Sequence, residues 1–114
     1  MTVDLPYPHK ALWPNGRAHH HAKAREVKKH RAWACTATQG ALGTAKGFVP
    51  TSITLHVHAK PKGPLPDKDN CIAAAKSSLD GIADALKVND RNFPAPLVVF
   101  ATVRDGRFAV ELGR

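Results

Sequence analysis

One short stretch of the chain carries side chains whose types and spacing suit chemistry on a charged substrate. Spacings of 4, 3 and 4 residues separate Asp69, Ala73, Lys76 and Asp80. At about 100° per residue these positions fall on one stripe of a helix, and Asp67 lies in the turn just before it. Carboxylate oxygens are the ligands that Mg²⁺ prefers, and the ion keeps several of its waters. The pattern therefore predicts a divalent-cation site beside a lysine that stabilises charge developing on a phosphate.

The same residues also allow a purely structural interpretation. An aspartate at a helix start commonly caps the first turn and interacts favourably with the helix dipole. Lys76 and Asp80 are four residues apart, which is the spacing of an ordinary surface ion pair. Spacing alone does not decide between the two interpretations.

The helix that must hold this stripe is predicted over residues 70–86. Its apolar positions recur at spacings of 3, 4, 3 and 4, at Ile72, Ala75, Leu79, Ile82 and Leu86. This period is typical of an amphipathic helix that packs one face on a core. Its start is expected to be capped by Asp67, Asp69 or Asn70.

Three β-segments are predicted around this helix. Strict alternation of apolar and polar residues predicts a strand over residues 52–60. Two runs rich in β-branched and aromatic residues, 97–103 and 108–112, are joined by Asp105-Gly106. This dipeptide between two such runs is a strong hairpin signal, so the last two strands are predicted to pair with each other.

The first half of the chain predicts an edge strand and a basic helix. Prolines restrict residues 5–8 to an extended edge, and the absence of Gly and Pro favours a helix over residues 17–38, before a glycine-rich loop at 40–50. A chain of 114 residues and 12.3 kDa fits one domain, residues 1–114. The predicted fold is α/β (α+β), a small mixed sheet of about four strands with two main helices packed on it.

The net charge of +8 is distributed unevenly along the chain. Residues 1–62 hold ten basic and two acidic side chains, whereas residues 63–114 hold seven of each. A basic surface of this strength favours a polyanionic partner, with nucleic acid before an anionic membrane. The second half has no net charge, because its basic side chains are balanced by carboxylates that include Asp67, Asp69 and Asp80.

Compartment and redox state are also constrained by composition. No apolar run approaches the roughly 20 residues that span a bilayer, and residues 1–15 do not follow the pattern of a secretory signal. Cys35 and Cys71 lack the spacing of a zinc finger or a redox motif. We expect a cytoplasmic protein with two thiols and no membrane partner.

Four short motifs follow one another in the second half of the chain. They are Pro66-Asp67-Lys68-Asp69-Asn70, then Lys76, then Leu79-Asp80-Gly81-Ile82, then Val88-Asn89-Asp90. In this order and spacing they resemble the RusA family of Holliday-junction resolvases, which are small bacterial and phage endonucleases. The proline-rich opening and the basic segment after it are also similar to the family's start, so the resemblance covers most of the chain.

The resemblance implies a homodimer that binds four-way DNA junctions and nicks two opposed strands with Mg²⁺ or Mn²⁺. By position, the family's metal-binding acids match Asp67, Asp69 and Asp90, and Lys76 is similar to its catalytic lysine. Asn70 and Asp80 are expected to orient Lys76 and the acids. The implied partner is branched double-stranded DNA, and no small-molecule cofactor is implied. The resemblance also implies a protein of the bacterial cytoplasm that is encoded by a bacterium, a phage or a prophage.

Two departures from the family pattern leave other functions open. In the best-known branch of the family the lysine follows the asparagine by three residues, where this chain has Ala73. The family often has two consecutive acids where this chain has Asn89-Asp90. These departures favour, as the alternative, a catalytically degenerate protein that binds DNA junctions without nuclease activity. A third possibility is a zinc-dependent hydrolase that uses His56 and His58, which share one face of a predicted strand.

Basic residues of the predicted first helix are expected to hold the DNA. They are Arg17, Lys23, Arg25, Lys28, Lys29 and Arg31. Contacts to phosphates would position the protein without reading sequence, and the alternative is an ordinary solvated helix face. The run His19-His20-His21 is expected to line phosphate or solvent, and Trp33 is expected to lie in the core.

Overall fold

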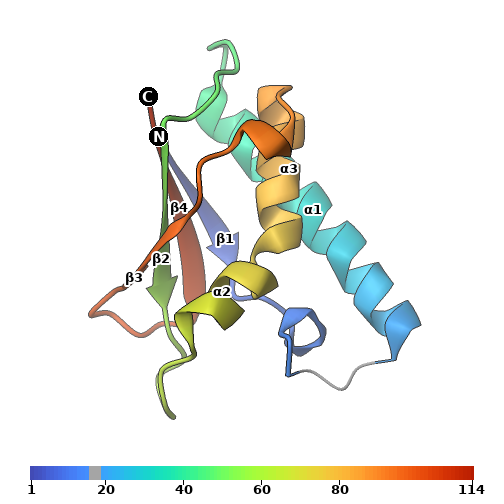
Figure 1. Cartoon of the computed structure of the whole chain (residues 1–114), viewed down its shortest axis with the longest axis vertical. Helices are drawn as coiled ribbons and strands as arrows, with labels where there is room; N and C mark the ends of the chain where they lie inside the picture. The colour runs from blue at the N-terminus through green and yellow to red at the C-terminus, as the bar shows by residue number, and fades with distance from the viewer. Residues whose placement is uncertain (16–18) are drawn as a thin grey trace.

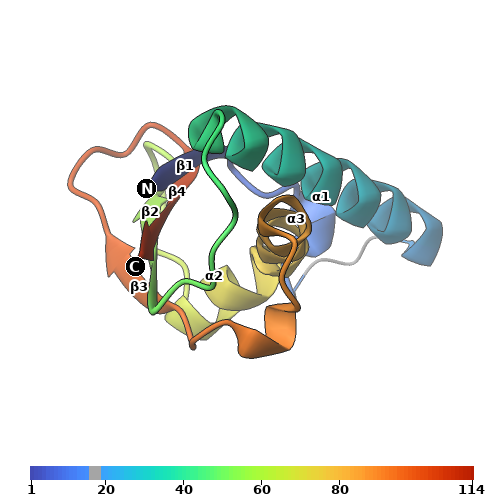
Figure 2. The ribbon, with the colours of Figure 1, turned by 90° about the horizontal axis from the view of Figure 1, so that it is seen from above.

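A four-stranded mixed sheet and three α-helices make up the computed structural model, which describes residues 1–15 and 19–114. The strands are β1 (Thr2–Pro6), β2 (Ser52–His58), β3 (Leu97–Phe100) and β4 (Arg107–Gly113). The helices are α1 (His20–Leu42), α2 (Lys68–Ala74) and α3 (Lys76–Leu86), with short 3-10 helices η1 (Lys10–Leu12) and η2 (Asp90–Asn92). All three α-helices lie on the same side of the sheet (Figures 1 and 2). The α+β class predicted from the sequence is confirmed.

Strand β2 lies in the interior of the sheet and shows the predicted alternation. Ile53, Leu55 and Val57 are buried against the helices, whereas His56 and His58 lie on the opposite face and are half-buried. Because successive side chains of a strand point to opposite faces, one face joins the core and the other stays accessible. Within the described residues, no helix is both long and apolar enough to cross a membrane.

The last two strands do not form the predicted hairpin. The sheet order is β1-β4-β2-β3, so β2 lies between β3 and β4; it runs parallel to β3 and antiparallel to β4. The segment 101–106 crosses the end of β2 and is anchored to it: Ala101 N donates to Val57 O at 2.9 Å, and Gly106 N donates to Ala59 O at 3.1 Å. Asp-Gly turns the chain here, with φ 72° at Gly106, but within a longer crossover connection. The prediction failed because turn chemistry reports a local bend and not which strands pair.

Helix boundaries also differ from the prediction. Helix α1 runs through Gly40 to Leu42 and ends at Gly43 with φ 60°, whereas a loop was predicted from residue 40. The single helix predicted over residues 70–86 is divided at Ala75, whose ψ of −3° interrupts the helical course. The division separates α2, which carries Asp69, from α3, which begins at Lys76.

Helices α1 and α3 approach each other closely at Gly81. A Cβ built at this position would collide with the backbone oxygen of Arg31, whereas one at Gly40 would meet nothing within 4 Å. We expect Gly81→Ala to lower the free energy of unfolding by about 1–3 kcal/mol through overpacking. Gly40→Ala, within α1, should raise it by roughly 0.5–1 kcal/mol through helix propensity. Urea unfolding followed by circular dichroism checks both, and shifts in the same direction would contradict the packing explanation.

Candidate functional site

One ammonium and two carboxylates form a compact cluster at the start of α3. Lys76 Nζ donates to Asp80 Oδ1 at 2.6 Å and to Asp90 Oδ2 at 2.8 Å. The Lys76 side chain is 62% exposed and Asp80 is 21% exposed, so the cluster lies at the surface with Asp80 at its inner side. We refer to Lys76, Asp80 and Asp90 as the lysine–carboxylate cluster.

Three pieces of local backbone bring this cluster together. Lys76 is the first residue of α3, and Asp80 follows one turn later on the same face. The helix ends at Leu86, and its C-cap residue Lys87 adopts the left-handed conformation with φ 59° and reverses the chain. Asn89 then caps η2 by accepting a hydrogen bond from Arg91 N at 3.1 Å, and Asp90 returns to Lys76.

Mutual attraction fixes the charge states within the cluster. The hydrogen bond to Asp80, followed by that to Asp90, raises the pKa of the Lys76 ammonium. The hydrogen bond from Lys76 lowers the pKa of the Asp90 carboxyl. Both groups are therefore charged throughout the neutral range, because each stabilises the other's ionised form.

The other two predicted metal ligands lie at the start of α2. Asp67 is the N-cap: its Oδ1 accepts from Asp69 N at 2.8 Å and from Asn70 N at 3.3 Å. The Asp69 side chain is exposed in the first turn. Asp67, Asp69 and Asp90 do not form a close group of metal-binding side chains, since the one such group among the described residues consists of three histidines.

The side chains of these acids are of the chemical type that binds a divalent cation such as Mg²⁺. They supply oxygen ligands alone, as Mg²⁺ requires. Asp80 and Asp90 already converge on one cation, the Lys76 ammonium. Asp67 uses one oxygen as a cap, so its second oxygen is the one available to an ion.

The capping role of Asp67 can be separated from any metal role by substitution. Asn caps a helix as well as Asp does, whereas Ala does not. We expect Asp67→Ala to lower the free energy of unfolding by about 1 kcal/mol, and Asp67→Asn to leave it nearly unchanged. Thermal unfolding in EDTA measures both. If Asp67→Asn destabilises the protein as much as Asp67→Ala, the hydrogen bonds to the α2 start are not what Asp67 contributes.

Three grooves meet at the lysine–carboxylate cluster. One of about 210 Å³ is lined by all three of its members. A second, of about 290 Å³, passes Lys76 and Asp80 and reaches Lys23 of α1. A third, of about 270 Å³ and polar, lies against Asp80, Asp90 and Arg31. Asp80 lines all three, so the cluster is accessible from several directions.

The third groove contains an ion pair that the sequence analysis did not single out. Arg31 binds Asp84 through two hydrogen bonds, from Nε at 2.7 Å and from Nη2 at 2.9 Å. This contact lowers the pKa of the Asp84 carboxyl and raises that of the Arg31 guanidinium. Asp84 follows Asp80 by four residues, a spacing that places both on one helix face. Its partner Arg31 is 53 residues away in the sequence, and no sequence pattern indicates this pairing.

The predicted DNA-binding residues are in different states. Lys23, Arg25 and Lys28 are exposed along α1, Lys29 donates to Glu26 Oε1 at 3.3 Å, and Arg31 is held by Asp84 as described. Arg17 lies outside the described residues. The exposed cations therefore remain suitable for phosphate contacts, whereas the side chain of Arg31 is directed towards the third groove.

Trp33 is not in the core, contrary to the sequence prediction. Its side chain is 47% exposed on α1, with its ring centre 5.0 Å from that of the buried His30 and 5.9 Å from Lys29 Nζ. The buried side chains of α1 recur every four residues, at Glu26, His30, Ala34 and Thr38. Trp33 precedes Ala34 and so points away from that stripe.

His56 and His58 are engaged with other partners on the accessible face of the sheet. His56 Nε2 lies 2.9 Å from Glu111 Oε1, and His58 Nδ1 lies 3.0 Å from Val103 O. Among the residues that the structure describes, neither belongs to a group of three close metal-binding side chains. These contacts give the zinc-hydrolase alternative no support.

Comparison with known proteins gives a similar protein whose description names no function. No protein-family model matches the chain. The chain is 37% identical over 102 residues to a protein of Xylella fastidiosa (strain Temecula1) that is described as uncharacterized. The match covers 86% of this chain and 66% of that relative. The chain thus spans just under two thirds of the relative's length, and the similarity carries no information on activity.

Proposed function

We propose that this protein is a divalent-metal-dependent endonuclease that cleaves phosphodiester bonds in branched DNA, as the resemblance to the RusA resolvases implies. The observation that supports this proposal most directly is the lysine–carboxylate cluster at the meeting point of three grooves. One of these grooves continues to Lys23 on the basic helix α1. A phosphate held by α1 would thereby lie beside a charged lysine and several carboxylates.

Each residue has a defined task in this proposal. Asp67, Asp69 and Asp90 would hold the ion through carboxylate oxygens. The bound ion would supply an activated water and neutralise a phosphate oxygen. Lys76 stays protonated, because its pKa is raised by Asp80 and Asp90, and so stabilises negative charge on the phosphate or leaving oxygen. Asp80 holds the ammonium in place at 2.6 Å.

Binding of DNA is assigned to the exposed cations of α1. Lys23, Arg25 and Lys28 would contact phosphates and position the junction without reading its sequence. A four-way junction offers two equivalent strands, and a homodimer with two-fold symmetry would present one site to each. We place this activity in the bacterial cytoplasm, with Mg²⁺ or Mn²⁺ as the ion.

Cleavage of a synthetic four-way junction tests the proposal directly. The wild-type protein is expected to nick labelled junction strands with Mg²⁺ and not in EDTA, whereas Asp69→Asn should be strongly impaired. Asp69 is exposed, so its substitution should leave folding intact. Equal nicking by the two proteins, or junction binding by both with nicking by neither, would refute the catalytic role.

The second candidate function is junction binding without catalysis. The observation that favours it is that Asp67, Asp69 and Asp90 do not gather as a close group, while Asp90 is already paired with Lys76. Calorimetric titration with Mg²⁺ separates the two functions. A nuclease should show a Mg²⁺ site that Asp90→Asn and Asp69→Asn weaken, whereas a pure binding protein should show none that depends on these carboxylates.

A further inference from the structure

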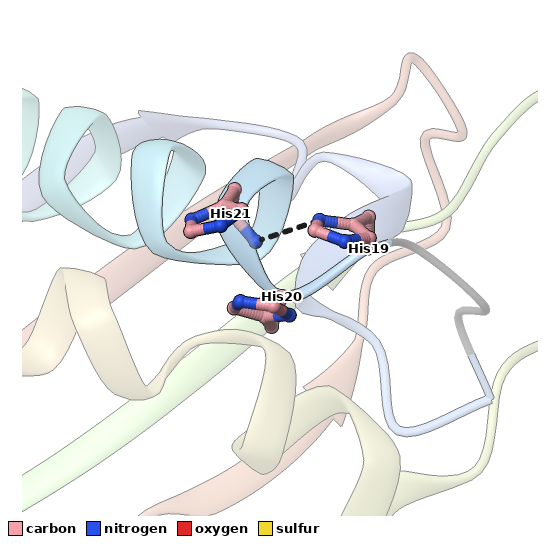
Figure 3. A group of neighbouring side chains, drawn as sticks. All are labelled: His19, His20 and His21. Carbon is pink, nitrogen blue, oxygen red and sulfur yellow. Dashed lines mark hydrogen bonds between the residues drawn. The ribbon is translucent and has the colours of Figure 1, made fainter.

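Three consecutive histidines gather at the start of α1, away from the lysine–carboxylate cluster. His19, His20 and His21 are all exposed, and one ring nitrogen from each lies within 4.8 Å of the others. Their ring centres are 4.0–5.0 Å apart, and the three rings gather at the start of the helix (Figure 3). In the part of the chain that the structure describes, this is the one group of three potential metal ligands so close together.

The backbone explains why three adjacent residues converge. Within a continuous helix, successive side chains diverge by about 100° each, so three in a row would fan out. His19 is the N-cap residue and lies outside the helix, with φ −57° and ψ 144°. Its Nδ1 accepts a hydrogen bond from His21 N at 3.3 Å, which folds its ring back over the first turn (Figure 3). The cap geometry therefore accounts for the position of His19 beside His20 and His21, the first two residues of the helix.

We propose that His19, His20 and His21 together bind one divalent metal ion of the Zn²⁺ type. Neutral imidazole nitrogens are common ligands of this ion, at about 2.0–2.1 Å. With these Zn–N distances, the nitrogens of a tetrahedral site lie about 3.3 Å apart. The three histidine nitrogens lie within 4.8 Å of one another, and rotation of these exposed side chains can bring them to the shorter distance. His19 Nε2 and one nitrogen each of His20 and His21 serve as ligands, so His19 Nδ1 keeps its cap.

Three protein ligands leave the fourth position of the ion open to an exogenous group. The surroundings favour an anion there, because the first turn of α1 contains no acidic residue and the helix N-terminus carries a partial positive charge. Lys23 follows on the next turn and lines the groove that leads to Lys76. A phosphate oxygen is thus the exogenous ligand that this position suits.

Zinc titration of the untagged full-length protein tests the site. In competition with a chromogenic chelator, Zn²⁺ alone is expected to bind at one ion per chain, with a Kd below about 10 µM. The variant His19→Asn/His20→Gln/His21→Gln should lose this binding while Asn keeps the helix cap. The matched variant His56→Gln/His58→Gln removes two other histidines and should bind as wild type does.

Cobalt supplies a spectroscopic readout that does not depend on any enzymatic activity. Co²⁺ in a tetrahedral site with three imidazoles should give visible absorption bands that the triple variant lacks and that Asp69→Asn retains. The proposal is overturned if wild type binds no Zn²⁺ in this range, if the triple variant binds equally well, or if loss follows the His56/His58 change. Far-UV circular dichroism confirms that each variant is folded.

Discussion

Asp90→Asn is expected to reduce Mg²⁺-dependent nicking of a four-way junction by about 10²–10³-fold. Asp90 accepts from Lys76 at 2.8 Å and lines two of the three grooves at the cluster, so its charge acts on both the lysine and any ion held there. The change from carboxylate to amide preserves shape and removes the charge. Initial rates on a labelled junction, with protein in excess, measure the effect on the chemical step.

Junction binding should not be weakened by the same substitution. Removal of a negative charge near the DNA is expected to leave binding in EDTA unchanged or slightly stronger. Asp105→Asn is the matched control, since Asp105 pairs with Arg107 in the connection between β3 and β4, away from the cluster. Equal losses of nicking in the two variants would show that Asp90 has no special role.

Lys76→Met should lower nicking by a similar factor of about 10²–10³, because Lys76 donates to both Asp80 and Asp90 and so holds its positive charge between them. Met retains much of the length of the side chain and removes the ammonium. Lys76→Arg keeps the charge with a different geometry and should recover part of the rate. Lys46→Met removes one exposed positive charge elsewhere and should leave nicking within about twofold of wild type. A fully active Lys76→Met protein would exclude a catalytic lysine at this position.

The pH dependence of nicking follows from the raised pKa of Lys76. Since Asp80 and Asp90 favour the ammonium, its contribution is complete below the ordinary lysine value of about 10.4 and is lost only above it. Asp80→Asn removes the largest of these influences, so the alkaline loss of activity should move to lower pH in this variant. Rate profiles from about pH 9 to about pH 11 cover this loss and make the comparison. A profile that is unchanged by Asp80→Asn would mean that Asp80 does not control the lysine.

Features of the fold that lie within one helix or strand could be predicted from the sequence, whereas the pairing of one element with another could not. Alternation at Ile53, Leu55 and Val57 reports burial of one strand face directly, and this strand is present as predicted. Turn residues, by contrast, describe a bend of a few residues. The crossover of residues 101–106 around β2 depends on which strand finds which partner, and that choice is made by the packing of the whole sheet.

The candidate site shows the same limit. Helical spacing correctly placed Lys76 and Asp80 on one exposed face, because that relation is contained in one element. The pairing of Lys76 with Asp90 depends on the chain reversal at Lys87, and the pairing of Arg31 with Asp84 on the close approach of α1 and α3. Neither the chain reversal at Lys87 nor the close approach of α1 and α3 is indicated by a periodic pattern in the sequence. Exposure of Trp33 was missed for a related reason, since residue type alone favours burial.

The position of β4 within the sheet sets the order in which the molecule can be completed during synthesis. β4 hydrogen-bonds to both β1 and β2, yet it is the last of the four strands in chain order. Until residues 107–113 emerge from the ribosome, β1 has no partner in the sheet and β2 lacks one of its two. Translation proceeds at about 5–20 residues per second, so the nascent chain spends several seconds with unpaired edges on β1 and β2. We therefore expect this domain to assemble only when β4 arrives, with chaperone contacts concentrated before that moment.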